Sequence, residues 1–181
     1  MFLSDTAIKK LLKEESLTIS PYPNEKDIRP HSVRVHLGAK LIQYDDQVVD
    51  PTQEIELSYK EIDLSNEPFI LKPNAFVLGS TVESVRTPRH IFGFLDGRST
   101  LARLGLTIHI TAAVTDSLYD DARVITLEIH NASNMSIVLS HKMAIGALLF
   151  AELDQPVAQD AQKQYKGQQG PLPSNLKNQF S

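Results

Sequence analysis

The sequence predicts a mainly β fold, either a sandwich or a distorted, jelly-roll-like barrel, with an N-terminal helix and a short central helix. Segments in which apolar and polar residues alternate recur along the chain, and prolines interrupt the chain between them. The chain has 181 residues, of which 41% are hydrophobic and 22% charged, so it can bury one sizeable core. We therefore expect one β domain over residues 1–155, followed by a C-terminal arm over residues 156–181.

The first element expected is a helix over residues 4–14. Ser4 can cap its N-terminus, and Ile8, Leu11 and Leu12 recur at helical spacing on one side, with lysines on the other. An amphipathic helix of this kind is stable when its apolar side is covered. We expect that side to pack against a sheet.

Strands are expected along most of the remaining chain. In the segment 32–38, Val33, Val35 and Leu37 share one face of a strand, and polar residues that include Arg34 share the other. Further strands are expected at 41–44, 54–58, 68–71, 75–85, 90–95 and 122–131.

Charge and composition exclude several classes of function. The 18 Lys and Arg against 22 Asp and Glu give a formal net charge of −4, which does not favour a nucleic-acid partner. The chain has no cysteine, which excludes disulfides, thiol catalysis and the zinc nucleobase deaminases, whose metal is held by cysteines. The six histidines show no metal-ligand spacing. The longest apolar run, 143–151, is too short to span a bilayer, so we expect a cytoplasmic protein without a membrane partner.

The segment 97–105, GRSTLARLG, predicts a polar turn that leads into a short helix. Arg98 and Ser99 stand where the helix would begin, so a guanidinium, a hydroxyl and main-chain N–H groups can converge on one anion. Arg103 follows Ser99 by one helical turn on the same face, and Gly105 suits the left-handed residue that ends a helix. The segment predicts a phosphate-binding cradle. A capped turn whose two arginines pair with nearby carboxylates remains the alternative.

A second polar position lies in the strand expected over 122–131. Ile125, Leu127 and Ile129 form its apolar face, which places Glu128 on the opposite face beside Thr126. A carboxylate in this position can serve as a general base that takes a proton from water. An exposed strand glutamate without a catalytic role is the alternative that the residues alone leave open.

Beyond Pro156 the composition changes, and Gln, Gly, Pro and Ser become the dominant residues. A segment of this composition cannot build a core of its own. It is therefore expected either to lack fixed structure or to dock elsewhere, on this subunit or on a neighbouring one.

Three motifs together resemble the dCTP deaminase family, which belongs to the trimeric dUTPase superfamily. They are GRSTLARLGL at 97–106, HITA at 109–112 and TLEI at 126–129. The resemblance also takes in the N-terminal helix, the strand at 32–38, the segment 143–150, and residues 165–174 with their QQG at 168–170. It thus extends over nearly the whole chain.

The resemblance implies a dUTPase-type fold that assembles as a homotrimer, with each active site built from more than one subunit. The implied reaction is the zinc-independent, hydrolytic deamination of dCTP to dUTP and ammonia in pyrimidine deoxynucleotide metabolism. The implied ligands are dCTP and dUTP, with dTTP as a candidate inhibitor.

The resemblance also implies roles for particular residues. The residues matching Arg98, Ser99 and Arg103 hold the triphosphate, and Mg²⁺ is bound through the phosphates rather than by protein side chains. The residue matching Glu128 activates the water that attacks C4 of cytosine. The other implied substrate contacts are Thr100 in the cradle, Ala112 near the attacking water, Asp116 at the sugar, Thr126 beside Glu128, and Gln168 in an arm that closes over the nucleotide.

The sequence departs from the family pattern at several places, one of which is a tyrosine expected after Pro156 that is absent. After Asp116 the family has Pro-Gly and an aromatic residue, whereas this chain has SLYDD at 117–121, with two extra residues before Glu128. Arg34 stands where the family usually has aspartate, and Gln164 where it has a lysine of the arm. Two alternatives to a plain dCTP deaminase therefore stay open: a bifunctional enzyme that goes on to form dUMP, and a nucleotide-binding regulator with impaired catalysis.

Overall fold

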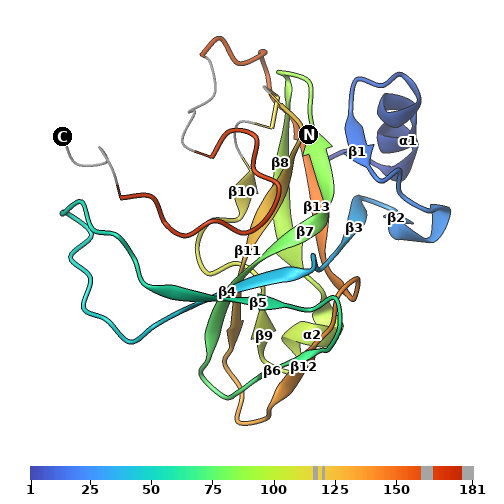
Figure 1. The fold of residues 1–181 in the computed structure, drawn as a ribbon. Coiled ribbons are helices and arrows are strands. Elements are labelled where there is room, and N and C mark those ends of the chain that lie inside the picture. The colour runs from blue at the N-terminus through green and yellow to red at the C-terminus, as the bar shows by residue number, and fades with distance from the viewer. Residues whose placement is uncertain (116–117, 120, 160–164, 177–181) are drawn as a thin grey trace.

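The structure is a computed structural model that describes residues 1–115, 118–119, 121–159 and 165–176. Strands account for most of its regular structure (Figure 1). In chain order the elements are α1 (Asp5–Lys13), β1 (Thr18–Ser20), the 3₁₀ helix η1 (Glu25–Asp27), β2 (Ile28–Arg29), β3 (Ser32–His36), β4 (Lys40–Tyr44), β5 (Tyr59–Asp63), β6 (Phe69–Leu71), β7 (Phe76–Arg86), β8 (Ile91–Gly97), α2 (Ser99–Ala102), β9 (Leu106–Thr107), β10 (Val114–Thr115), β11 (Arg123–Asn131), β12 (Ile137–Leu139) and β13 (Ala144–Glu152).

Two antiparallel sheets make up the body of the protein. One has the strand order β5-β4-β7-β11-β9, with β1 added to β7, and the other has the order β10-β8-β13-β3-β2. A small third sheet joins β12 to β6. Every strand pair is antiparallel among the described residues, which agrees with the alternating sequence pattern of half-buried strands. The predicted mainly β architecture with one N-terminal and one short central helix is confirmed.

The core lies where the apolar faces of the long strands meet. Val33, Val35 and Leu37 are fully buried, while Arg34 on the opposite face of β3 is partly exposed, as the alternation predicts. The same pattern holds in β11, whose apolar face is buried. The largest fully buried side chains of the core include Phe150, Ile8, Leu17, Leu37, Leu41, Leu71, Leu95, Leu106, Ile108, Leu127, Ile129 and Leu139.

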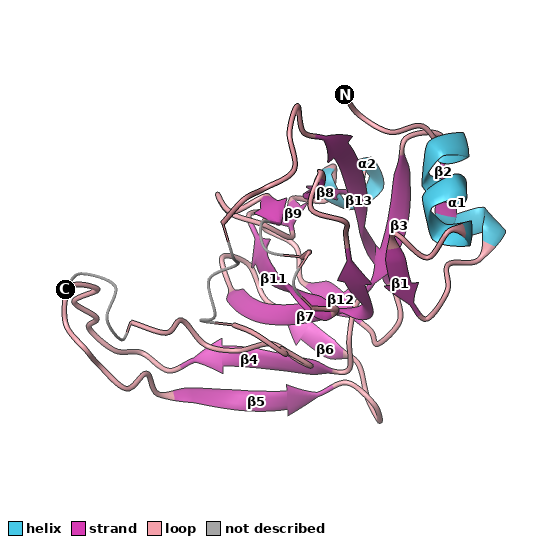
Figure 2. Ribbon diagram, turned by 90° about the horizontal axis from the view of Figure 1, so that it is seen from above, coloured by secondary structure: helices cyan, strands magenta, loops and turns pink. Residues whose placement is uncertain are grey.

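The predicted N-terminal helix is confirmed as α1. The Ser4 hydroxyl accepts a hydrogen bond from the Ala7 N–H, and Ile8 and Leu12 are buried. In Figure 2 the helix lies at one side of the molecule, beside β1, β2 and β3. Neither α1 nor any other helix of the described residues has the length and apolarity needed to cross a membrane.

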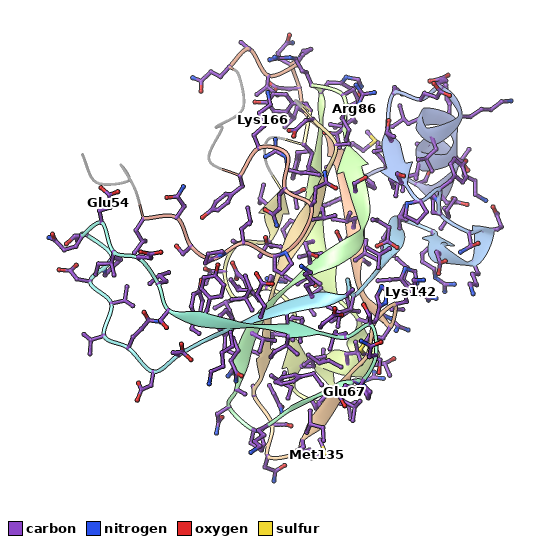
Figure 3. The ribbon with its side chains drawn as sticks, in the orientation of Figure 1. Glu54, Glu67, Arg86, Met135, Lys142 and Lys166 are labelled. Atoms are coloured by element: carbon purple, nitrogen blue, oxygen red, sulfur yellow. The ribbon has the colours of Figure 1, made fainter. Side chains whose placement is uncertain are left out.

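The strand predicted at 54–58 is wrong. Those residues belong to a long loop, and the strand that pairs with β4 is β5, at Tyr59–Asp63. Because β5 is an edge strand with mostly exposed side chains, main-chain pairing rather than burial defines it. Apolar alternation therefore gives no signal for it. Together β4, β5 and their loop extend away from the body, with Glu54 near the far end (Figure 3).

Candidate active site

The segment 97–105, called the cradle below, forms the expected turn and short helix where β8 ends. Arg98 has an extended backbone and caps α2, which begins at Ser99, so the first N–H groups of the helix have no acceptor within it. Ser99, Thr100 and Arg103 are exposed. The structure thus presents hydroxyls, a guanidinium and main-chain donors together at the surface, which suits the binding of phosphate oxygens.

The Arg98 side chain is anchored to a neighbouring strand. Its Nη1 donates to the carbonyl oxygen of Ala144, at 2.7 Å, and so ties the cradle to β13. Within the described residues, neither Arg98 nor Arg103 forms an ion pair with a carboxylate. The alternative of a turn held by arginine–carboxylate pairs therefore has no support from the described residues.

Gly105 ends the cradle in the left-handed conformation that its position predicts. Its φ is +80°, and a Cβ added to it would lie 3.0 Å from the main-chain nitrogen of Ser133. We expect Gly105→Ala to lower the free energy of unfolding by about 1–3 kcal/mol, because strained backbone and a main-chain clash combine. Urea denaturation measures the change. Gly170→Ala is the matched control, because an added Cβ meets nothing within 4 Å there. Equal stability of the two variants would contradict the expectation.

A cavity of about 540 Å³ lies beside β11. Its walls come from β11, residues 112–115 and 118, the ends of β4 and β7, and the C-terminal arm, defined here as residues 165–176. Its lining residues include Tyr44, Ala112, Thr115, Arg123, Thr126, Glu128 and Gln168.

Glu128 projects into this cavity from the face of β11 predicted by the alternation. Its Oε2 accepts a hydrogen bond from the main-chain N–H of Ile110, at 2.7 Å, and its own N–H donates to the carbonyl oxygen of Ile108. The carboxylate is therefore held in one orientation by the segment that also places Ala112 in the cavity wall. A fixed carboxylate in a partly enclosed cavity is the arrangement that proton transfer from a bound water requires.

Gln168 closes the cavity from the arm. Only 6% of the residue is exposed, and its Nε2 donates to the Thr126 hydroxyl at 2.6 Å. The Gln168 carbonyl oxygen in turn accepts from the Val124 N–H. The arm therefore docks on β11 of its own chain, next to Glu128, and Figure 1 shows it running from β11 towards β4.

Tyr44 fixes the far end of the arm. Its hydroxyl oxygen accepts a hydrogen bond from the Ser174 N–H, at 2.9 Å. Burial raises the pKa of this hydroxyl above its ordinary value, although the bond from Ser174 acts in the opposite direction. Tyr44 therefore stays neutral at physiological pH and serves as a hydrogen-bonding group in the cavity wall.

The structure brings some of the predicted site residues together and leaves others apart. Ala112, Thr126, Glu128 and Gln168 all line the cavity, whereas the cradle residues do not. The cradle adjoins β9, and β9 pairs with the last residues of β11. The cradle therefore lies near one end of β11, and Arg123 lies at the other end. Asp116, predicted at the sugar, and Gln164 lie outside the described residues.

Sequence reasoning missed a second hydrogen-bonded group in the cavity wall. Arg123, at the start of β11, pairs with Asp121, and the same carboxylate accepts from the Gly167 N–H of the arm at 2.7 Å. The only sequence signal is an Asp and an Arg two residues apart before an apolar strand, which is too common to single out. Tyr44 was missed for a different reason, because it comes from a strand far from the arm in the sequence.

No cluster of three or more His, Cys, Asp or Glu side chains in the described part of the chain has the arrangement of a metal site. The donors of the cradle are guanidinium, hydroxyl and N–H groups, which bind phosphate oxygens rather than a bare cation. These residues fit a metal ion only if the phosphates of a nucleotide carry it.

Comparison with known families identifies relatives over almost the full chain. A family model described as dCTP deaminase-like matches residues 2–153. A dCTP deaminase of Buchnera aphidicola subsp. Acyrthosiphon pisum is 38% identical over an alignment of 192 positions, gaps included, which covers 97% of this chain and 98% of that protein. A protein named "dCTP deaminase, dUMP-forming" from Dictyoglomus thermophilum is 36% identical over 190 residues, covering 99% and 97%.

Solved structures show the same fold. The 2′-deoxycytidine 5′-triphosphate deaminase of Agrobacterium tumefaciens superposes with a TM-score of 0.64 at 18% identity, covering 82% of this chain and 47% of that one. A mutant dUTPase from phage phi11 of S. aureus, described with a structural Mg(II) ion, gives a TM-score of 0.51 at 10% identity and covers 80% and 95%. The predicted dUTPase-type fold is thereby confirmed.

Proposed function

Because the chain belongs to the dCTP deaminase-like family, we propose that it is a hydrolase that converts dCTP and water to dUTP and ammonia. The observation that carries the proposal is the position of Glu128, fixed by the Ile110 N–H inside a cavity large enough for a pyrimidine and its sugar.

The chemistry follows from the geometry around Glu128. The carboxylate takes a proton from a water molecule as the water oxygen bonds to C4 of cytosine. The carboxyl group passes this proton to N3 as the C4–N3 double bond opens. It then moves the remaining hydroxyl proton to the amino group, so that the bond from C4 to the amino nitrogen breaks, ammonia leaves and a C4 carbonyl forms. General acid–base assistance of this kind contributes about 10²- to 10⁴-fold to a rate. The docked arm keeps bulk water away from the base during these steps.

We propose that the cradle of one subunit completes the cavity of the next in a homotrimer. The separation of the cradle from the cavity within one chain supports this arrangement. Large apolar side chains near both regions are also exposed: Leu104 by 42%, Ile110 by 52% and Val114 by 56%. Side chains of this kind are typical of an interface between subunits. In the assembled site, Arg98, Ser99, Thr100 and Arg103 would bind the triphosphate, and Asp116 the sugar.

We propose that Mg²⁺ enters with the nucleotide. The donors of the cradle suit phosphate oxygens, so the phosphates themselves would hold the ion. Bound to the phosphates, Mg²⁺ would neutralise part of their negative charge. The cytoplasm is the location proposed for a protein that acts on soluble nucleotides.

Docking of the arm depends on the Thr126 hydroxyl, which leads to a prediction. Thr126→Val keeps the shape of the side chain but leaves the buried Gln168 amide without its acceptor. We expect trypsin to cut after the exposed Lys166 about fivefold faster or more, because loss of this bond raises the population of the undocked arm. Mass spectrometry of timed digests identifies the cut, and Figure 3 shows Lys166 on the arm. Thr107→Val, at an exposed threonine, is the control. Unchanged cleavage would show that this bond does not hold the arm.

Incubation of the purified protein with dCTP and Mg²⁺, followed by nucleotide chromatography, tests the function. We expect dUTP and equimolar ammonia. Formation of dUMP and pyrophosphate instead would identify the bifunctional alternative, which has support because relatives of both kinds match at similar identity. Binding of dCTP without any product would identify the regulator. Addition of dTTP to the same assay tests it as an inhibitor.

A further inference from the structure

The cavity has an acidic end and a basic end. Of the described residues that line it, Glu128 and Arg123 are the charged ones. They belong to the same strand and are five residues apart, which corresponds to about 16 Å along an extended chain. A ligand that lies along β11 therefore meets a carboxylate at one end and a guanidinium at the other.

The Arg123 guanidinium is buried but incompletely satisfied. Only 8% of the residue is exposed, and its Nη2 is paired with the Asp121 carboxylate. Its Nε is buried and has no hydrogen-bond acceptor among the described residues. A guanidinium keeps its charge at any physiological pH and can only donate. A buried donor of this kind that lacks an acceptor destabilises the protein until a ligand supplies one.

A second unpartnered polar atom lies in the same wall. The Thr115 hydroxyl is buried, lines the cavity and has no partner within the described residues. Thr115 is held there because it pairs with Gly93 of β8, whose lack of a side chain leaves room for the hydroxyl. Arg123 and Thr115 are thus two residues of the cavity wall that each carry a buried polar atom without a partner among the described residues.

We propose that Arg123 is a nucleotide-binding residue, which donates to a phosphate group of the substrate whose base lies at Glu128. This inference rests on the function proposed above and extends it. A cytosine nucleotide carries its amino group at one end and its phosphates at the other, which matches the order of the two charges along β11. Phosphate is the acceptor that a fixed guanidinium binds most strongly.

Asp121 places the guanidinium for this role. One of its oxygens pairs with Arg123, and the other accepts from the Gly167 N–H of the docked arm. The same carboxylate therefore holds the arginine side chain against the cavity wall and fastens the arm beside it. The pairing occupies Nη2 and leaves Nε for the ligand.

Binding measurements with ligands that differ only in phosphate content test the inference. Dissociation constants for dCTP, dCMP and deoxycytidine are measured by calorimetry on Glu128→Gln and on Glu128→Gln with Arg123→Met. This background keeps the ligands intact, and chromatography of each sample verifies that. We expect Arg123→Met to weaken dCTP and dCMP by about 10- to 100-fold and to leave deoxycytidine unchanged. Arg86→Met, at an exposed arginine that lines a different groove, is the matched control.

Two outcomes would overturn the inference: unchanged affinity for dCTP, or an equal loss for dCTP and deoxycytidine, which would show a purely structural role. If thermal melting shows that the methionine variant does not fold, Arg123→Lys takes its place, with an expected loss of about tenfold for dCTP relative to deoxycytidine. If the ratio of the dissociation constants for dCTP and deoxycytidine is unchanged in that variant, the inference is equally overturned. Failure of the proposed function has a separate signature, since the wild-type protein would then form no product from dCTP.

Discussion

Replacing Glu128 by glutamine is expected to lower kcat for dCTP deamination by about 10²- to 10⁴-fold while dCTP still binds with wild-type affinity. The amide keeps nearly the volume of the carboxylate, and its oxygen can still accept from the Ile110 N–H. It cannot take a proton from water at neutral pH, so the step that activates the nucleophile is lost. Quenched-flow or steady-state product analysis gives kcat, and calorimetry gives the dissociation constant.

The matched control is Glu61→Gln, which changes an exposed glutamate of β5 that contacts Lys40. Surface pairs of this kind contribute little, so its kcat should equal that of the wild type. A Glu128→Gln variant that turns over dCTP at the wild-type rate would remove Glu128 from the mechanism. Parallel loss of binding and turnover would instead indicate that the glutamate holds the cavity in shape.

Combining two impaired variants in one trimer is expected to restore activity. Arg103→Ala should raise KM for dCTP by about 10- to 100-fold, because a charge-assisted phosphate contact disappears. If the cradle of one subunit serves the cavity of another, a mixed trimer of Arg103→Ala and Glu128→Gln subunits contains sites with both wild-type residues. Every mixed trimer, whichever variant supplies two of its subunits, contains one complete site, about one third of its sites. Co-expression with two affinity tags isolates the mixed trimers, and their kcat/KM is then measured.

The control for this experiment combines Glu128→Gln subunits with subunits that carry both substitutions. No complete site can form in that mixture, so its activity should stay at the level of the Glu128→Gln variant. If verified mixed trimers of the two single variants also show no recovery, the cradle and Glu128 do not meet across subunits. The separation of these two groups within one chain would then have to be bridged by a change of conformation.

The fold could largely be predicted because alternation and burial agree in its long strands. Val33 and Val35 in β3 and Leu37 directly after it, like the apolar face of β11, are buried as the period of two requires. For the same reason Glu128 could be placed on the cavity side of β11 from the sequence alone. The edge strand β5 could not be predicted, since its extended conformation depends on main-chain pairing with β4 and not on a buried face.

The candidate site could be predicted only where a single segment carries its chemistry. The cradle is one continuous segment, so its helix start at Ser99 and its left-handed Gly105 follow from residue order. The contact of Tyr44 with Ser174 and that of Asp121 with Gly167 join positions 130 and 46 residues apart. No local pattern encodes such pairs, because folding, not spacing, brings them together.

The register of β11 has a consequence for how proteins of this family can diverge. From Thr126 to His130 the strand pairs residue by residue with Ser80 to Phe76 of β7, and the irregularity in pairing lies before Thr126. Insertions or deletions upstream, such as the two extra residues between Asp116 and Glu128, can therefore be absorbed before the regular ladder begins. Changes in the length of that connection between related proteins leave Glu128 at its place in the ladder.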